Sequence, residues 1–340
     1  MNLLKTIIQG KLEFGNQKSY DKVLKMFIYR AENYYKSDVI LDPEEVFDED
    51  ALIMTVPRYV GTHMEKSWKN AVALIEYCAQ FAISGEMGAW QTDSGKIINS
   101  AQIEPESDKA VVIQFRKGKK LADQKGKEEE AIEALTKAIE KYDKHAQAYE
   151  RRAKVNVTLK NDHDAMRDYN KCLNLDDSIP DAYYGRANIH IRNGEIDKAI
   201  ADLELTLKKS IALQPIYWAA RRVKANCLIK EKRYEDAAFD LKLFTNRKFD
   251  KDNPNYKWRK EALSTYGKVL LDLEEYDEAL KAFDKAFEIE EDANEKENGK
   301  RLYFRGVAKQ KAGKSGFIKD IKKAADLGIT EAADLLAEMA

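Results

Sequence analysis

The sequence has few prolines, cysteines and histidines, and it contains no long apolar run. Only 6 prolines interrupt 340 residues, so helices are seldom broken. The 3 cysteines, Cys78, Cys172 and Cys227, are an odd number at distant positions, which argues against a disulfide framework and favours buried, reduced thiols. No apolar stretch approaches the length of a membrane span, and 34% of the residues are charged. These absences predict a soluble, mainly helical protein.

Signatures of catalysis and of cofactor binding are missing as well. The 4 histidines include no pair at metal-ligand spacing, and no Cys-x-x-Cys occurs. The nearest approach to a phosphate-binding loop, Gly313-Lys314-Ser315, lacks the glycine that such a loop has five places earlier. The acidic run from Asp42 to Asp50 offers oxygen ligands for a divalent cation, but without the glycine and spacing of a calcium loop a solvated loop is favoured. We therefore expect no enzyme, no metal and no cofactor.

The net charge of −1 hides a small asymmetry along the chain. Residues 1–111 carry 12 Lys or Arg against 17 Asp or Glu, a balance of −5, and the remainder carries 46 against 42, a balance of +4. Neither part is basic enough to predict nucleic-acid binding. A local cluster of six cations between Arg116 and Lys127 is followed by three glutamates, so a solvated helix face is favoured there over a nucleic-acid patch. The stretch 1–14 has Lys5 within a short apolar run and no small-residue cleavage site, and we expect a cytoplasmic protein.

The chain repeats itself with a period of 34 residues. Sliding residues 146–179 onto 180–213 superimposes Ala153 on Ala187, Ala165 on Ala199, Arg152 on Arg186 and Asp168 on Asp202. Small residues at fixed places are what a helix-turn-helix solenoid needs, because each unit buries its apolar face only by packing closely on the next. Further copies follow Ala131, Ala237 and Ala279, and the steps of 38 and 42 from Ala199 to Ala237 and from Ala237 to Ala279 indicate insertions.

These units resemble tetratricopeptide repeats. The residues that carry the resemblance are an aromatic four places before a small residue in the first helix, as in Tyr149/Ala153 and Tyr183/Ala187, and a tyrosine, two acids and an alanine at the entry to the second, as in 234–237 and 276–279. The resemblance covers about residues 112–328 and implies about six repeats in an α-solenoid spanning 111–340, closed by a capping helix at 331–339. Such repeats bind protein segments on a concave surface.

Residues 1–110 do not fit the repeat and predict a separate small domain. Apolar residues at three- and four-residue steps indicate amphipathic helices over 18–36 and 64–83. We expect strands at 6–14, at 51–56 ending at Pro57, and at 97–103, with a hairpin through Trp90 punctuated by glycines. The order of strand, helix, strand, helix, strand, strand predicts a small α/β domain with a mixed sheet.

The resemblance also indicates which side chains face the concave surface. Counting from the small residue of each first helix gives eight partner-binding candidates: Arg151, Lys154, Tyr184, Asn188, Arg192, Arg222, Asn226 and Lys230. Asn188 and Asn226 occupy equivalent places in adjacent units, where two amides could hold the backbone of an extended peptide. Five cations against the two anions Glu150 and Asp181 favour an acidic segment. Ordinary solvated residues are an equally acceptable interpretation of these positions.

One specialised function of the family can be tested against the sequence. Members that bind the acidic tail of a heat-shock chaperone carry a pattern of lysine, asparagine and arginine in three successive first helices. This chain has Phe115 and Lys119, then Arg151, then Asp181 and Gly185, so no chaperone-tail clamp is present in this register.

We therefore expect a non-enzymatic adaptor or scaffold that binds an extended, acidic protein segment, with no nucleic acid and no membrane insertion. The alternative is a regulatory or catalytic domain at 1–110, whose substrate or partner is recruited by the repeats. A closed pocket containing Arg58, His63 or the acidic run would favour the alternative.

Overall fold

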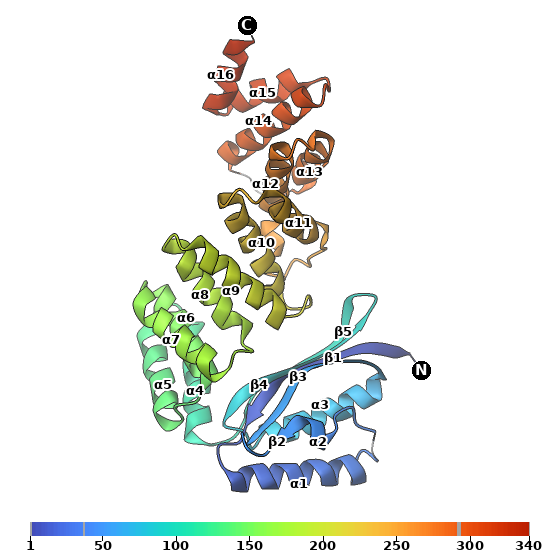
Figure 1. Cartoon of the computed structure of the whole chain (residues 1–340), viewed down its shortest axis with the longest axis vertical. Helices are drawn as coiled ribbons and strands as arrows, with labels where there is room; N and C mark the ends of the chain where they lie inside the picture. Colours follow the sequence, from blue (N-terminus) through green and yellow to red (C-terminus); the bar gives the residue numbers. More distant parts are fainter. Residues whose placement is uncertain (1, 37, 291–293, 340) are drawn as a thin grey trace. The chain divides into compact units, whose positions relative to one another are not determined.

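A computed structural model describes residues 2–36, 38–290 and 294–339 of the chain (Figure 1). Its contacts divide it into two compact units, Met1–Arg186 and Ala187–Ala340, with the boundary inside helix α8. The first unit combines the sheet domain with the first helical repeats, and the second contains only helices.

The first unit begins with a five-stranded sheet. Its elements are β1 (Leu3–Glu13), α1 (Gln17–Asn33), α2 (Pro43–Val46), β2 (Phe47–Asp48), β3 (Ile53–Met64), α3 (Glu65–Ala79), β4 (Ser84–Asp93) and β5 (Lys96–Ile103). Their order along the chain confirms the predicted alternation of strands and helices, with the short α2 and β2 in addition. Within the sheet the strand order is β2-β3-β1-β4-β5. β4 and β5 are joined through Ser94 and Gly95, whose positive φ angles of 48° and 81° are those that a two-residue hairpin turn requires.

The predicted mixed pairing was wrong, because every strand pair is antiparallel. β3 and β4 are each antiparallel to β1, so they run in the same direction and α3 joins them by a crossover. β1 lies between them and prevents the parallel pair that a strand-helix-strand sequence pattern predicts.

The predicted end of a strand at Pro57 was also wrong, because β3 continues to Met64. Ile8 pairs with Tyr59 and Gly10 pairs with Val56, so Pro57 and Arg58 together face Gln9 in a β-bulge. A bulge tolerates proline because the ladder does not use its missing N–H group.

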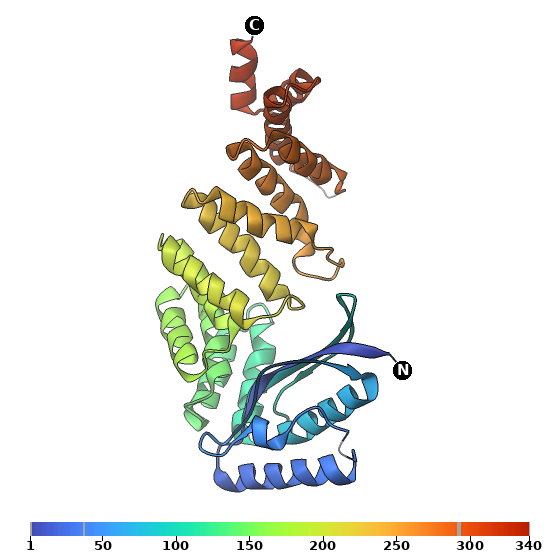
Figure 2. The ribbon, with the colours of Figure 1, turned by 45° about the vertical axis from the view of Figure 1, so that its right-hand side comes forward.

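One face of this sheet is covered by helices (Figure 2). Tyr20, Val23 and Phe27 of α1 and Leu74 and Ile75 of α3 are buried. They pack in one apolar core with Ile8, Leu12, Met54 and Met87 of the strands.

Helical repeats follow the sheet in the first unit. They comprise α4 (Ala110–Ala122), α5 (Glu128–Lys141), α6 (Ala146–Thr158), α7 (Asp162–Leu175) and the start of α8 (Pro180–Arg192). The predicted small residues Ala153 and Ala165 are fully buried at the helix crossings. A Cβ atom on Gly118 would lie 2.6 Å from the side chain of Leu135, so α4 and α5 approach too closely for a larger residue.

The sheet and the first repeats of this unit share side-chain contacts. Tyr142 donates a hydrogen bond from its hydroxyl to Glu13 over 3.1 Å, and Lys11 forms an ion pair with Asp176 at 3.1 Å. Ile83, just before β4, packs with Val111 and Val112 of α4. The sheet and the repeats up to Arg186 thus form one compact unit, while the predicted border at residue 110 stays a prediction.

The second unit continues the repeats. Its helices are the remainder of α8, α9 (Ile196–Lys209), α10 (Pro215–Lys230), α11 (Tyr234–Asn246), the short η1 (Tyr256–Trp258), α12 (Arg259–Asp272), α13 (Tyr276–Glu288), α14 (Glu295–Lys311), α15 (Phe317–Asp326) and α16 (Thr330–Glu338). The solenoid of about six helix pairs with a C-terminal capping helix is therefore confirmed. Segment 247–258, which includes η1, accommodates the longer of the two predicted insertions.

The turn inside each pair contains a residue with a positive φ angle. One residue there has a left-handed conformation in every described pair: Gly126, Lys160, Gly194, Lys232, Glu274 and Gly313. In five of these turns the next N–H group bonds back to a carbonyl five residues earlier, for example Asn161 to Asn156 at 2.8 Å. This hydrogen bond pairs a carbonyl group at the end of the first helix. The position with positive φ, which glycine usually takes, is lysine or glutamate in three of the turns.

Candidate functional site

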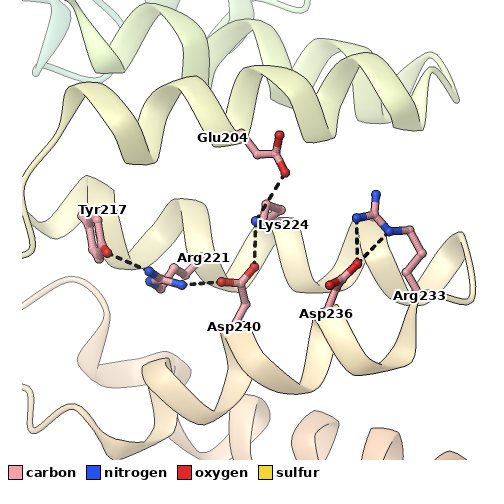
Figure 3. A network of polar contacts seen from close by, with 7 residues as sticks. All are labelled: Glu204, Tyr217, Arg221, Lys224, Arg233, Asp236 and Asp240. Atoms are coloured by element: carbon pink, nitrogen blue, oxygen red, sulfur yellow. Dashed lines mark hydrogen bonds and ion pairs between the residues drawn. The ribbon is translucent and has the colours of Figure 1, made fainter.

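The cations of α10 fall into two groups, one of which is structural. Arg221 and Lys224 both contact the carboxylate of Asp240 on α11, with Lys224 at 3.1 Å (Figure 3). Arg221 also donates to the hydroxyl of Tyr217 over 2.7 Å, and Lys224 reaches Glu204 on α9 at 3.6 Å. Asp240 is only 2% exposed, so this network joins neighbouring helices and is not available to a ligand.

Pairs of an arginine and a buried aspartate also join neighbouring helices elsewhere in the chain. Arg152 of α6 makes two hydrogen bonds, of 2.8 and 2.9 Å, to Asp168 of α7. Arg305 of α14 makes two of 2.8 Å to Asp320 of α15. A bidentate pair fixes the orientation of both groups. Arg152 and Asp168, two of the residues that the 34-residue repeat matches, are thus paired within a repeat, whereas Arg186, the match of Arg152, donates to Asn170 over 2.7 Å.

The second group of α10 cations faces away from that network. Arg222, Asn226 and Lys230 follow one another at four-residue steps, which places them on one face of the helix. Asn226 and Lys230 are exposed, and the Arg222 guanidinium lies 4.0 Å from the ring centroid of Trp258. We name Arg222, Asn226 and Lys230 the α10 stripe. Trp258 holds its first member in place by stacking.

The other predicted binding residues of the second unit lie on α8. Asn188 is half-buried and Arg192 is exposed one turn later on the same face. Further along this unit, the Lys268 ammonium lies 4.5 Å from the ring centroid of Phe304, and burial lowers the pKa of Lys268. Five of the eight predicted residues thus belong to the second unit, and Arg151, Lys154 and Tyr184 belong to the first.

In the first unit, Arg151 lies in an acidic environment. Its Nε atom is 3.3 Å from Glu150, a carboxylate that is only 4% exposed. Burial raises the pKa of Glu150 to about 7, against the lowering effect of Arg151, and Asp181 and Glu86 raise it further. Glu150 in turn raises the pKa of Arg151. Lys154 is exposed and Tyr184 is half-buried.

Carboxylates of the sheet domain contribute to this environment, which the repeat pattern could not predict. Glu86 of β4 and Glu104, just after β5, both act on Arg151, and Glu104 also pairs with Lys119 of α4. Burial raises the pKa of Glu86 as well. Neither glutamate lies within the 34-residue period, so no spacing connects them to α6. Trp258 was missed for a related reason, because it follows an insertion.

The residues on which the enzymatic alternative depends are found in the sheet domain. Arg58 donates to Gln9 over 2.9 Å, and the hydroxyl of Tyr59 lies 2.5 Å from Nε2 of His63. The first part of the acidic run forms the N-cap and first turn of α2, where Asp42 accepts a hydrogen bond from the backbone of Glu44, and the run ends in β2 and the turn that follows it. Within residues 2–36, 38–290 and 294–339, no group of three or more His, Cys, Asp or Glu is placed to hold a metal ion.

Comparisons with known proteins identify the repeats. A family profile described as tetratricopeptide repeat matches residues 184–241, and a second profile of the same description matches 113–140, 146–178 and 261–292. In the described part of the chain, no helix is both long and apolar enough to cross a membrane. A search of curated proteins gives no match.

Two solved structures share the fold. YrrB, described as a TPR protein with an unusual peptide-binding site, is 22% identical with a TM-score of 0.52, over 62% of this chain and 100% of that one. PilF of Pseudomonas aeruginosa is 18% identical with a TM-score of 0.52, over 68% of this chain and 98% of that one.

Proposed function

The chain is a tetratricopeptide-repeat protein, a class whose fold serves protein-protein interaction, and we propose that it is a non-enzymatic adaptor that binds an extended, acidic protein segment. The observation that carries the proposal is the α10 stripe, with Arg222 stacked on Trp258. Asn226 and Lys230 of the stripe are both exposed. The other two cations of α10, Arg221 and Lys224, contact Asp240.

The chemistry of the stripe fits a peptide backbone flanked by carboxylates. An amide side chain donates and accepts hydrogen bonds, so Asn226 can pair with a backbone whatever its side chains are. Arg222 and Lys230 supply positive charge on either side of it, which favours an acidic segment and accelerates its association. The peptide-binding site described for YrrB, a protein of the same fold, adds support for a peptide ligand.

The proposal extends to the residues at matching repeat positions. Asn188 and Arg192 provide the same pair of groups in the preceding repeat of the second unit. In the first unit Lys154 takes the position of Asn188, and Arg151 and Tyr184 are included as further predicted residues of the first helices, where Arg151 also balances Glu150. We propose further that the protein acts in the cytoplasm and that the sheet domain either caps the repeats or recognises a second partner.

The test begins with a partner isolated by affinity capture with the full-length protein and then purified. The double variant Asn226→Ala/Lys230→Ala should weaken its binding by about 1–3 kcal/mol, the scale of one or two hydrogen bonds involving a charged group. The matched control is Lys242→Ala/Asn246→Ala, an exposed lysine and asparagine at the same spacing on α11, which should leave the affinity unchanged.

A second arm separates charge from hydrogen bonding. Reversal of Arg192 and Arg222 to glutamate should weaken binding more at low salt than at 0.5 M, where the Debye length is only a few ångströms. The proposal would be overturned by a purified partner that binds both double variants as tightly as the original protein but does not bind once residues 1–110 are deleted. That result would favour the alternative in which the sheet domain carries the activity.

A further inference from the structure

A surface hollow of about 410 Å³ lies on the sheet domain, at the outer side of α1. It is formed between the last turns of that helix and the segment that leads to α2. Its size falls within the range of about 300–1,000 Å³ that is usual for binding sites. The lining residues are Ile28, Ala31, Glu32, Val39, Ile40, Leu41, Asp42 and Pro43.

The far wall of the hollow is held in a fixed position. Asp38 accepts hydrogen bonds from Ser67 over 2.6 Å and, at its carbonyl, from Asn70 over 2.9 Å, both on α3. Leu41 is 5% exposed and belongs to the core beneath the hollow. Pro43 begins α2 and has its φ angle fixed by its ring. A preformed wall requires little ordering when a partner binds.

The floor of the hollow is apolar and partly exposed. Ile28 is 38% exposed, and Val39 and Ile40 are half-buried against the core. Tyr29, beside Ile28, is 51% exposed. Apolar side chains gathered around a concavity are typical of a surface that receives an apolar side chain of another molecule.

The rim of the hollow is negatively charged. Glu32 lies one turn after Ile28 on α1, Asp42 lines the opposite wall, and Glu44 and Glu45 follow in the first turn of α2. All four are exposed, and no ion pair links any of them to another residue of the described chain. Two of the neighbouring cations have other partners, since Lys66 pairs with Asp38 and the Arg30 guanidinium stacks on Tyr77 at 3.7 Å.

We propose that this hollow docks a basic segment of a partner protein through one large apolar side chain. The apolar side chain packs on Ile28, Val39 and Ile40, which form the floor of the hollow. Lysine or arginine residues next to it in the partner meet Glu32 and Asp42, with Glu44 and Glu45 nearby. This surface has the opposite charge preference to the α10 stripe and does not depend on the repeats.

Two synthetic peptides test the charge preference with the full-length protein. In the background Asn226→Ala/Lys230→Ala, which weakens the acidic-segment site proposed on α10, labelled Lys-Lys-Leu-Phe-Lys-Lys should bind at least tenfold more tightly than Glu-Glu-Leu-Phe-Glu-Glu, as measured by fluorescence anisotropy at low salt. The variant Glu32→Lys/Glu45→Lys should reduce binding of the basic peptide at least tenfold. The control Glu76→Lys/Glu129→Lys changes the net charge equally at two other exposed acids and should change the affinity less than twofold.

The apolar anchor is tested separately. Ile28→Ser should reduce affinity for the basic peptide at least fivefold, whereas Ile113→Ser, at an isoleucine that is 51% exposed on α4, should not. Circular dichroism would verify that both variants remain folded. Equal binding of the two peptides, or equal losses in the paired variants, would overturn the proposal. So would a dimer in sedimentation that Ile28→Ser dissociates, because the hollow would then receive a second copy of the chain.

Discussion

Removal of the Asp240 carboxylate should strongly destabilise the second unit. Asp240→Ala leaves Arg221 and Lys224 without their buried counter-charge, and the side chains of these two cations are only 13% and 16% exposed. Tyr217 then remains as a partner of Arg221, and Glu204 at 3.6 Å as a partner of Lys224. Breaking a buried charge pair in this way costs about 3–5 kcal/mol.

A matched control lies one turn away on the same helix. Asp236 pairs with Arg233 at 2.7 Å, but the two side chains are 57% and 50% exposed (Figure 3). Exposed pairs of this kind contribute about 0–1 kcal/mol, so Asp236→Ala should have little effect. The difference between the two alanine variants is therefore expected to be about 2–5 kcal/mol.

Urea unfolding followed by circular dichroism would measure this difference, and amide hydrogen exchange would locate it. Neighbouring repeats can unfold in part, so loss of protection should concentrate in α10 and α11. Asp240→Asn keeps the volume and one acceptor, and it should fall between the two alanine variants. Equal stability of the Asp240 and Asp236 alanine variants would refute the reasoning, because the buried network would then contribute no more than a surface pair.

Three other perturbations have definite expected outcomes. The raised pKa of Glu150 means that the folded state holds its proton more tightly than the unfolded state, so its contribution to stability is present below about pH 4.5 and is lost as the pH rises through about 7. Glu150→Gln should thus increase the unfolding free energy at pH 8 by on the order of 1–3 kcal/mol, and unchanged urea midpoints from pH 5 to 8 in both proteins would contradict this. In Gly267→Ala the new Cβ would lie 2.7 Å from the buried ring of Phe283, so the free energy of unfolding should fall by about 1–3 kcal/mol. Thermal unfolding would measure this loss, and an unchanged midpoint would mean that α12 and α13 can separate at little cost. A fragment 111–340 loses the Tyr142–Glu13 contact, so hydrogen exchange should show weaker protection in α4 to α7 than in α9 to α13. Uniform protection would mean that the first repeats do not need the sheet domain for their stability.

The repeats were predictable because the packing that specifies them involves only residues of the same and adjacent repeats. The alanines at 153, 165, 187 and 199 recur at a spacing that only close helix packing requires, and all four are fully buried. Helices and their order follow from such patterns. The sheet was harder to predict, because a strand-helix-strand pattern does not reveal whether a third strand will enter between the two.

The candidate site was predictable only where the repeat is regular. Arg222, Asn226 and Lys230 followed from counting along a helix, and the structure places them on one face of α10. Trp258 could not be found by counting, because segment 247–258 breaks the period. The electrostatic interaction of Arg151 with Glu104 joins a repeat helix to the sheet domain. The two residues are 47 positions apart, and the 34-residue period does not relate them.

The central position of β1 has a consequence for the order in which the chain folds. Its partners are β3 and β4, so the middle strand of the sheet is made first, and its two edges are both paired only after about residue 93 has been synthesised. Its Lys11 meets Asp176 later still. Each helix pair, by contrast, needs only its own residues and those of the adjacent repeat. During synthesis the unpaired β1 therefore exposes Ile8 and Leu12, and it is the segment on which a chaperone, or an aggregating neighbour, would act.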